Sequence, residues 1–204
     1  MGAWSVLAVL GILAASQTGL ALFPLLTSYA PLALLALRPQ PEIMVLLTAR
    51  LSPIVIVLVA VPLRLLIHVS YYELGRWGGG RLVSRTRAGA WALKALSRPW
   101  LGVVLLVSCL AHQSTPVDMA LGARGSRRAH TVIALLMGVT VSSILLVWLG
   151  TELAPLSAEL LATLGEHRFI ALFGVIALTT FALSTWQLVR TAKAARKEHL
   201  DDEA

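Results

Sequence analysis

Residues 100–121 read WLGVVLLVSCLAHQSTPVDMAL, an apolar run that continues into a polar one. Six Lys or Arg residues lie within residues 76–98, before the run, and three lie within residues 124–128, after it. Because Lys and Arg collect on the cytoplasmic side of membrane spans, both ends of this segment are expected on that side. The polar half contains Pro116, which interrupts helical structure. Non-helical backbone at membrane depth is tolerated only where it is buried in protein or lines a water-filled cavity. The stretch therefore predicts a re-entrant hairpin rather than a simple span.

The composition of the 204-residue chain identifies the class of protein. Hydrophobic residues make up 57% of the chain and charged residues 13%, whereas soluble domains have roughly 45–50% apolar and about 25% charged residues. An integral membrane protein is therefore expected. The net charge of +7 could indicate a nucleic-acid partner, but the basic residues flank apolar runs. They are interpreted as topology signals and contacts with anionic lipid head groups, so no nucleic-acid partner is expected.

Apolar runs divide residues 1–190 into an all-α membrane domain with about four spanning helices and two re-entrant hairpins of opposite orientation. A span needs about 20 apolar residues. Thr27–Leu37 is too short to cross and contains Pro31, so it is expected to be re-entrant from the opposite face. Residues 1–22 are expected to be a retained span rather than a signal peptide. A signal peptide has positively charged residues before its apolar run, and here no Lys or Arg comes before that run. The expected spans are Trp4–Leu26, Ile43–Gly75, Thr131–Gly150 and Phe169–Val189.

Proline and polar residues interrupt the first two expected spans. Gln17-Thr18-Gly19 and Pro24 weaken the first, so a broken or hairpin-like element is expected there. Pro53 and Pro62 interrupt the second, and kinks are expected near both because proline removes a backbone donor and clashes with the preceding turn. The Tyr71-Tyr72 pair near the end of this run suits the membrane interface.

The segments between the spans differ in charge. Residues 81–99 are basic and predict an amphipathic helix on the anionic inner leaflet. Its apolar face would consist of Leu82, Trp91, Leu93 and Leu96. Thr151–His167 carries three Glu and no Lys or Arg, so it is expected outside. With residues 191–204 as a charged cytoplasmic tail, the chain is predicted to be a multi-pass protein of the inner (plasma) membrane. The two short, Pro-interrupted segments stand in corresponding positions of two halves, which points to an inverted repeat with a site at the midplane.

One segment resembles a known family. Tyr72-Glu73-Leu74-Gly75-Arg76-Trp77-Gly78-Gly79 resembles the Tyr-x-x-Gly-Arg-x-x-Gly segment of DedA-family proteins, also called VTT or SNARE-associated-Golgi-type membrane proteins. The order of features along residues 25–190 is similar to the family as well. The Pro-flanked acidic turn Pro39-Gln40-Pro41-Glu42 precedes a long helix that ends in this segment. A basic loop, a polar hairpin, Gly122, a span containing Gly138 and a final span follow.

The resemblance implies a protein that moves lipids, among them the polyprenyl phosphate of cell-wall synthesis, across or between leaflets. Proton coupling through membrane acids and arginines is proposed for some members. The sequence differs from the family pattern at two places. Ile67-His68 stands where the family often has Gly-Asp, so a histidine replaces an acid. The second hairpin of the family usually carries Arg and Pro, and here residues 111–116 read AHQSTP without the arginine.

Arg64 and His68 are candidate site residues, because they lie four residues apart in an apolar stretch and hence on one helix face. An ionisable residue inside a span is costly and marks a functional site by default. In the functional interpretation, Arg64 holds a lipid phosphate and His68 relays charge, since histidine can exchange a proton near neutral pH. In the alternative, Arg64 extends its charge to the interface and His68 is a hydrogen-bonded packing residue.

The polar half of the second hairpin supplies further candidates, namely His112, Gln113, Ser114, Thr115 and Asp118. They would line a hydrophilic cavity for a head group, or they would satisfy the backbone groups of broken helix ends. Asp118 is the sole acid of this region and is expected to pair with Arg124 or Arg64 rather than bind a proton.

Glu42 and Arg50 flank the outer hairpin and complete the candidate set. Glu42 matches the acidic turn of the family by position. The alternative for Glu42 is an exposed loop carboxylate.

The sequence carries no catalytic signature, so no enzyme activity, cofactor or metal site is expected. Gly78-Gly79-Gly80 lacks the Lys-Ser/Thr of a P-loop, and the His and acidic residues of the membrane domain lack zinc-like spacing. The predicted function is therefore non-covalent: assistance in moving a lipid or lipid phosphate across the bilayer.

The expected partners are membrane lipids with anionic head groups, including polyprenyl phosphate. The sequence is also compatible with a second copy of the chain or another membrane protein as a partner. The alternative function is that of a structural or accessory subunit of a membrane complex without transport activity. In that case small residues would pack against partner helices, namely Gly138, Ser142 and Ser143 in one span and Ala177 and Ser184 in another.

Overall fold

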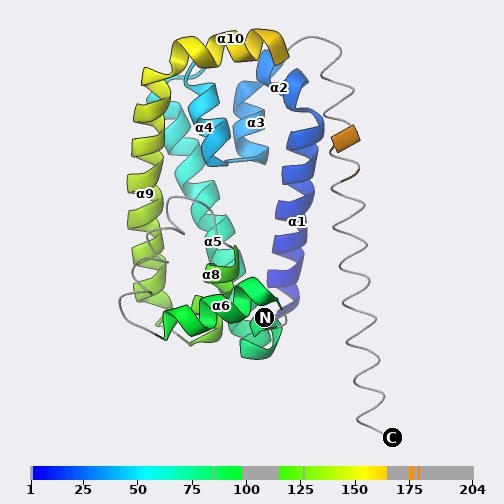
Figure 1. The fold of residues 1–204 in the computed structure, drawn as a ribbon, viewed down its shortest axis with the longest axis vertical. Helices are drawn as coiled ribbons and strands as arrows, with labels where there is room; N and C mark the ends of the chain where they lie inside the picture. Colours follow the sequence, from blue (N-terminus) through cyan, green and yellow to red (C-terminus); the bar gives the residue numbers. More distant parts are fainter. Residues whose placement is uncertain are drawn as a thin grey trace, which may run out of the picture.

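The computed structural model describes residues 2–84, 86–97, 115–125, 127–164, 175–176 and 179. These residues lie in helices or in short connections between helices, without a strand, which confirms the all-α class. Three long helices run along the long axis of the molecule (Figure 1): α1 (Gly2–Ala21), α5 (Pro53–Ser84) and α9 (Arg128–Glu152). Shorter helices lie between them or cover the ends.

Two helices are long and apolar enough to cross a membrane, Pro53–Gly80 within α5 and Arg128–Glu152. α1 together with α2 (Phe23–Tyr29) would make a third, but the two helices are bent by 77°. Pro24 lies in the first turn of α2 and cannot donate a hydrogen bond back to α1, so the chain bends before it. The predicted break in the first span is confirmed. The last expected span lies outside the described residues, apart from residues 175–176 and 179.

α3 (Pro31–Leu37) and α4 (Pro41–Leu47) form a helical hairpin. Each has seven residues and is therefore about 10 Å long, too short to cross a bilayer of about 30 Å. The turn follows from its prolines. The α conformation is disfavoured for a residue before proline, and Arg38 and Gln40, before Pro39 and Pro41, have non-helical backbone angles. The hairpin occupies the half of the molecule towards α10 (Ala154–Leu164).

The predicted run Ile43–Gly75 is divided in the structure. α4 ends at Leu47, and α5 begins at Pro53, where the missing N–H costs nothing because the first turn of a helix has no partner for it. The effect of Pro53 is thus stronger than the expected kink. α5 continues through Pro62 and loses helical geometry only at Gly79, with φ of 60° and ψ of −170°.

The second half-length element is α8 (Thr115–Ala123), which occupies the half of the molecule towards α6 (Arg87–Leu96). Pro116 lies in its first turn. Residues 98–114, which include the first half of the predicted hairpin, lie outside the described residues, so that hairpin stays a prediction. A half-length helix, a long helix and an end helix thus occur twice in order, as α4, α5, α6 and as α8, α9, α10. The two sets point in opposite directions (Figure 1), as expected of an inverted repeat.

The end helices differ in part from the expectations. α6 confirms the helix predicted within residues 81–99, and the Thr86 hydroxyl caps it by accepting a hydrogen bond from the N–H of Gly89 at 3.0 Å. Its buried side includes Ala92, Ala95 and Leu96, because α8 covers that side, whereas Trp91 is 58% exposed. The acidic segment expected outside is largely helical and forms α10 across the other end.

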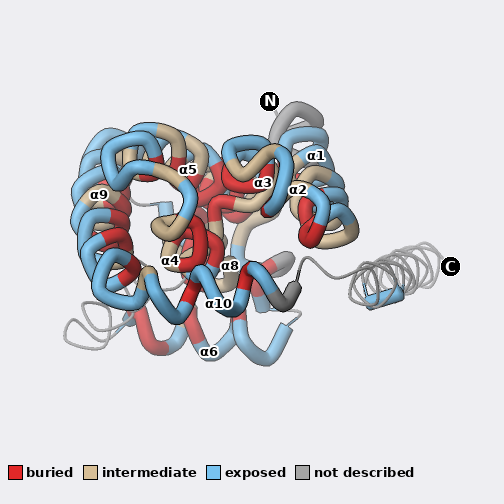
Figure 2. Tube along the Cα trace, turned by 90° about the horizontal axis from the view of Figure 1, so that it is seen from above, coloured by how far each residue is buried: buried red, intermediate tan, exposed pale blue. Residues whose placement is uncertain are grey.

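The largest buried apolar cluster lies at the α10 end and joins α2, α3, α4, α5, α9 and α10. Seen along the long axis, buried residues lie on the inner sides of α3, α4 and α9, and exposed residues face outwards (Figure 2). The outward residues of α9 include Ile133, Met137, Val141 and Trp148. A helix that is apolar on its outer side too is expected in lipid.

Candidate functional site

Arg64, His68 and Tyr72 follow one another at four-residue spacing on α5 and are all buried, with 1%, 0% and 0% of their surface exposed. Residues at this spacing lie on one helix face. Here that face is turned towards α8 and α9. Tyr71 is buried as well, so protein covers both tyrosines, and their expected position at the membrane interface stays a prediction.

The guanidinium of Arg64 is held between α5 and α9. Its Nη1 donates hydrogen bonds to the hydroxyl oxygens of Ser142 at 3.1 Å and Ser143 at 3.0 Å. The charge therefore lies in the helix interface and does not extend to the surface, which excludes that alternative for Arg64. It also places Ser142 and Ser143 on the inner side of α9, where they cannot serve the partner-helix packing expected of an accessory subunit.

His68 and Asp118 form a buried pair between α5 and α8. The imidazole Nδ1 lies 2.7 Å from Oδ2 of Asp118, and both side chains are fully buried. The expected partners of Asp118 were Arg124 and Arg64, and the structure shows His68 as a partner of its carboxylate. Arg124 instead donates to the backbone carbonyl of Leu96. A carboxylate from α8 thus lies beside His68 on α5.

Two glycines allow α8 to approach α5 this closely. A Cβ atom added to Gly75 would collide with the backbone carbonyl of Met119, and one added to Gly122 would collide with that of Tyr72. Small residues let helix backbones come into contact in membrane proteins. The glycines therefore fix the separation at which the short side chains of His68 and Asp118 meet.

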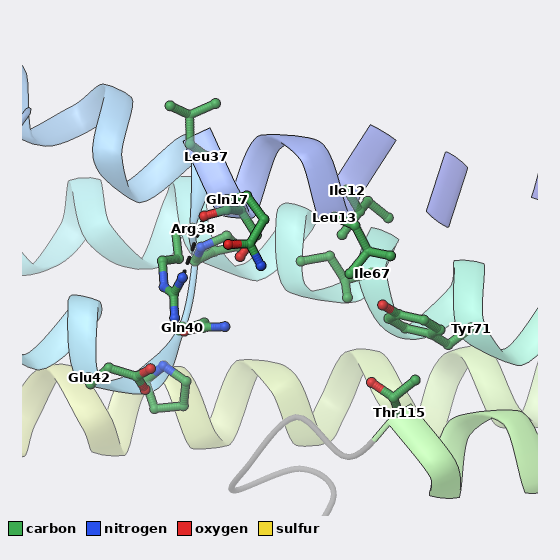
Figure 3. Close-up of a pocket in the computed structure, with 13 residues that line it drawn as sticks. Ile12, Leu13, Gln17, Leu37, Arg38, Gln40, Glu42, Ile67, Tyr71 and Thr115 are labelled. Carbon is green, nitrogen blue, oxygen red and sulfur yellow. Dashed lines mark hydrogen bonds between the residues drawn. The ribbon is translucent and has the colours of Figure 1, made fainter. Parts of the chain in front are cut away.

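A polar cavity of about 300 Å³ lies between α1, the α3–α4 turn, α5 and the start of α8. We refer to it below as the polar cavity. Figure 3 shows Arg38, Gln40 and Glu42 at one end of it and Tyr71 and Thr115 at the other. The remaining lining residues are Ile12, Leu13, Ser16, Gln17, Leu37, Pro39, Pro41 and Ile67. The two half-length elements, α3–α4 and α8, thus meet at one cavity from opposite ends of the molecule.

Among the described residues that line the polar cavity, Arg38 is the one with a positively charged side chain. Its Nη1 donates to the backbone carbonyl of Ser16 at 3.4 Å, a long bond that ties the turn to α1 (Figure 3). α1 comes close to the turn because Gly19 has no side chain: a Cβ there would lie 3.1 Å from the Cβ of Leu37 and 3.3 Å from that of Arg38. Arg38 and Glu42 carry opposite charges at this end of the cavity.

The candidate residues from the sequence are distributed over several places. Glu42 lines the polar cavity, Arg64 and the pair His68–Asp118 are buried beside α9 and α8, and Arg50 is exposed in the connection between α4 and α5. His112 and Gln113 lie outside the described residues.

Sequence reasoning did not select five polar residues of the cavity: Ser16, Gln17, Arg38, Gln40 and Tyr71. Arg38 and Gln40 could have been predicted as cavity residues, since both belong to the Pro-flanked turn that the sequence marks as a hairpin. Within the part of the chain that the structure describes, no three His, Cys, Asp or Glu residues group as a metal site.

The fold and the site define an all-α protein with helices apolar enough for a membrane and a polar cavity inside. No family model, curated protein or solved structure matches this chain. The resemblance of Tyr72–Gly79 to the DedA segment therefore stays a prediction.

Proposed function

We propose that this protein assists a lipid or lipid phosphate in crossing the bilayer, without covalent chemistry, and that the polar cavity receives the head group. The observation that carries the proposal is the meeting of two half-length elements at a polar cavity inside an apolar molecule. Moving a polar group through hydrocarbon without hydrogen-bond partners costs several kcal/mol. Polar side chains at this depth lower that barrier.

The membrane topology that we propose has about four spans and two re-entrant hairpins of opposite orientation. The α3–α4 hairpin enters from the α10 side, and the segment that ends in α8 enters from the α6 side. Basic residues at the α6 end include Arg87, Lys94, Arg127 and Arg128, and the end helix α10 carries Glu159. By the positive-inside rule the α6 end would face the cytosol.

Arg38 and Arg64 are the two arginines considered for binding the phosphate, and their surroundings differ. Arg38 lines the polar cavity, whereas Arg64 is not among the described residues that line it and is engaged by Ser142 and Ser143. We therefore assign the phosphate contact to Arg38. Arg64 holds α5 and α9 together, and Asp118 with His68 holds α8 in place.

The test is transport of a fluorescent short-chain lipid phosphate in reconstituted vesicles, followed by the fraction of label that a membrane-impermeant quencher reaches. We expect Arg38→Gln to slow transport by about tenfold or more, because a charge-assisted hydrogen bond of about 1.5–3 kcal/mol is lost. Arg50→Gln is the matched control, since Arg50 is exposed and does not line the cavity. Wild-type transport by the Arg38→Gln protein would contradict the proposal, and absence of transport by the wild type together with a stoichiometric membrane partner would favour the accessory subunit.

A further inference from the structure

A second, apolar cavity adjoins the polar cavity. It is a groove of about 300 Å³ between α1, α3 and α5, called the α1–α5 groove below. Four residues line both spaces: Ile12, Leu37, Pro39 and Ile67. The groove and the polar cavity therefore share a boundary that runs from α1 across the α3–α4 turn to α5.

The α1–α5 groove is suited to hydrocarbon. Among the described residues that line it, Ser70 is the one with a polar side chain, and its hydroxyl donates to the carbonyl of Leu66 at 2.7 Å. The bond satisfies the hydroxyl within its own helix, so the groove presents no polar group that needs a ligand. Its volume is at the lower end of small-molecule sites, which are about 300–1,000 Å³.

Small side chains on α1 leave the space in the groove. Ala8, Gly11 and Ala15 recur at a spacing of three and four residues and so lie on one helix face. A Cβ atom added to Gly11 would meet nothing within 4 Å. Leu66, on the α5 side, is 56% exposed, so the groove opens to the surroundings of the protein.

Charge distinguishes this groove from a second apolar one. A groove of about 480 Å³ beside α4, α9 and α10 also adjoins the polar cavity, through Pro41 and Glu42. The carboxylate of Glu42 would repel an anionic head group at that boundary. In the α1–α5 groove the boundary residues Leu37 and Pro39 flank Arg38, whose charge attracts it.

We propose that the α1–α5 groove holds the hydrocarbon chain of a lipid phosphate whose head group lies in the polar cavity. The inference rests on the proposed function and adds a route to it. The lipid enters sideways between α1 and α5, the chain stays in the groove, and Ile12 and Ile67 form the apolar boundary across which the head group passes.

The experiment uses two single-chain alkyl phosphates with a photoactivatable diazirine, one at the chain end and one next to the phosphate. Crosslinked peptides of the full chain in vesicles are mapped by mass spectrometry. We expect the chain-end probe to label α1 around Gly11 and α5 around Leu66, and the phosphate-side probe to label the turn that contains Arg38.

Variants fill the groove. Gly11→Leu enters open space, and Ala15→Leu fills the groove from the next turn of α1. Each is expected to lower chain-end labelling of α5 by about tenfold or more, because the leucine side chain occupies the space that the hydrocarbon chain would fill and the chain can then no longer bury its apolar surface there. Ala14→Leu is the matched control, since Ala14 is exposed and lines neither space. Thermal unfolding of each variant establishes that it is folded before labelling.

Two outcomes would overturn the inference, and they are distinguishable. If the phosphate-side probe labels the Arg38 turn but the chain-end probe labels the outer side of α9 as strongly as α1, the groove does not hold the chain and the proposed function stands. If the phosphate-side probe labels the turn no more strongly in the wild type than in the Arg38→Gln protein, the proposed function fails together with the groove.

Discussion

The α5–α8 contact and the α4–α9 contact occupy corresponding places in the two halves of the molecule. In each, a long helix carries a glycine 22 residues after its first residue, Gly75 in α5 and Gly150 in α9, against a half-length helix. The partners of the glycines differ. α8 presents Gly122 to α5 and adds the pair His68–Asp118. At the end of α4, the C-cap residue Thr48 contacts Gly150 instead, and its hydroxyl donates to the carbonyl of Gly150 at 2.7 Å.

This difference shows that one close approach of helices can be held in two ways. The α5–α8 contact depends on backbone touching backbone and on a buried pair of ionisable groups. The α4–α9 contact depends on a neutral hydrogen bond, and the atoms nearest to a Cβ added at Gly150 belong to the Thr48 side chain rather than to a backbone carbonyl. A change in the first contact is therefore expected to cost more than a corresponding change in the second.

The largest effect is expected from Asp118→Leu. The variant leaves His68 without its carboxylate in a fully buried place, and removing one member of a buried pair costs about 3–5 kcal/mol. The free energy or midpoint of unfolding in detergent micelles, followed by tryptophan fluorescence, measures it. The double variant His68→Leu with Asp118→Leu is the control and should recover much of the loss, because an apolar pair needs no partner. If Asp118→Leu alone unfolds together with the wild type, the pair does not hold α8.

Gly122→Ala is expected to have the next largest effect. The added methyl group collides with the backbone carbonyl of Tyr72, so α8 must move away from α5 at a cost of about 1–3 kcal/mol. Gly80→Ala is the matched control, since a Cβ at Gly80 would meet nothing within 4 Å. The same unfolding measurement compares the two. Equal stability of both variants would mean that α8 is not packed backbone to backbone on α5.

The smallest effect is expected in the α4–α9 contact. Thr48→Val keeps the shape of the side chain and removes the hydroxyl that bonds Gly150, which costs about 1 kcal/mol, and Thr48→Ser should retain the bond. Hydrogen exchange of the backbone amides near the end of α9 reports local loosening. Equal exchange in the Val and Ser proteins would show that the hydroxyl contributes nothing.

The parts of the fold that could be predicted from the sequence depend on local physics. The 77° bend before α2 and the start of α5 at Pro53 follow from the missing N–H of proline, and α6 follows from periodicity and its Thr86 cap. The break in helical geometry at Gly79 lies within the glycine run at residues 78–80, and glycine is the residue that adopts such a positive φ most readily.

The candidate site could be predicted only in part, because its contacts join residues far apart in the chain. The sequence marks Arg64, His68 and Asp118 as ionisable groups in apolar surroundings, but it does not tell which of them meet. Asp118 is 50 residues from His68, and a one-turn shift of α8 would have changed the pair. Tyr71 was assigned to the interface by residue type, whereas its burial comes from packing against Val9 and Ile12 of α1, which are distant in the sequence.

The hydroxyl partners of Arg64 lie 78 and 79 residues further along the chain. A ribosome adds about 5–20 residues per second, so several seconds separate the synthesis of α5 from that of α9. During that interval α5 carries a guanidinium that has not yet met these two serines, and insertion scales assign about 2.5–3.5 kcal/mol to an arginine at the centre of a lone span. The contact between Arg64 and its two serine hydroxyls thus forms only after α9 has been synthesised and has packed against α5.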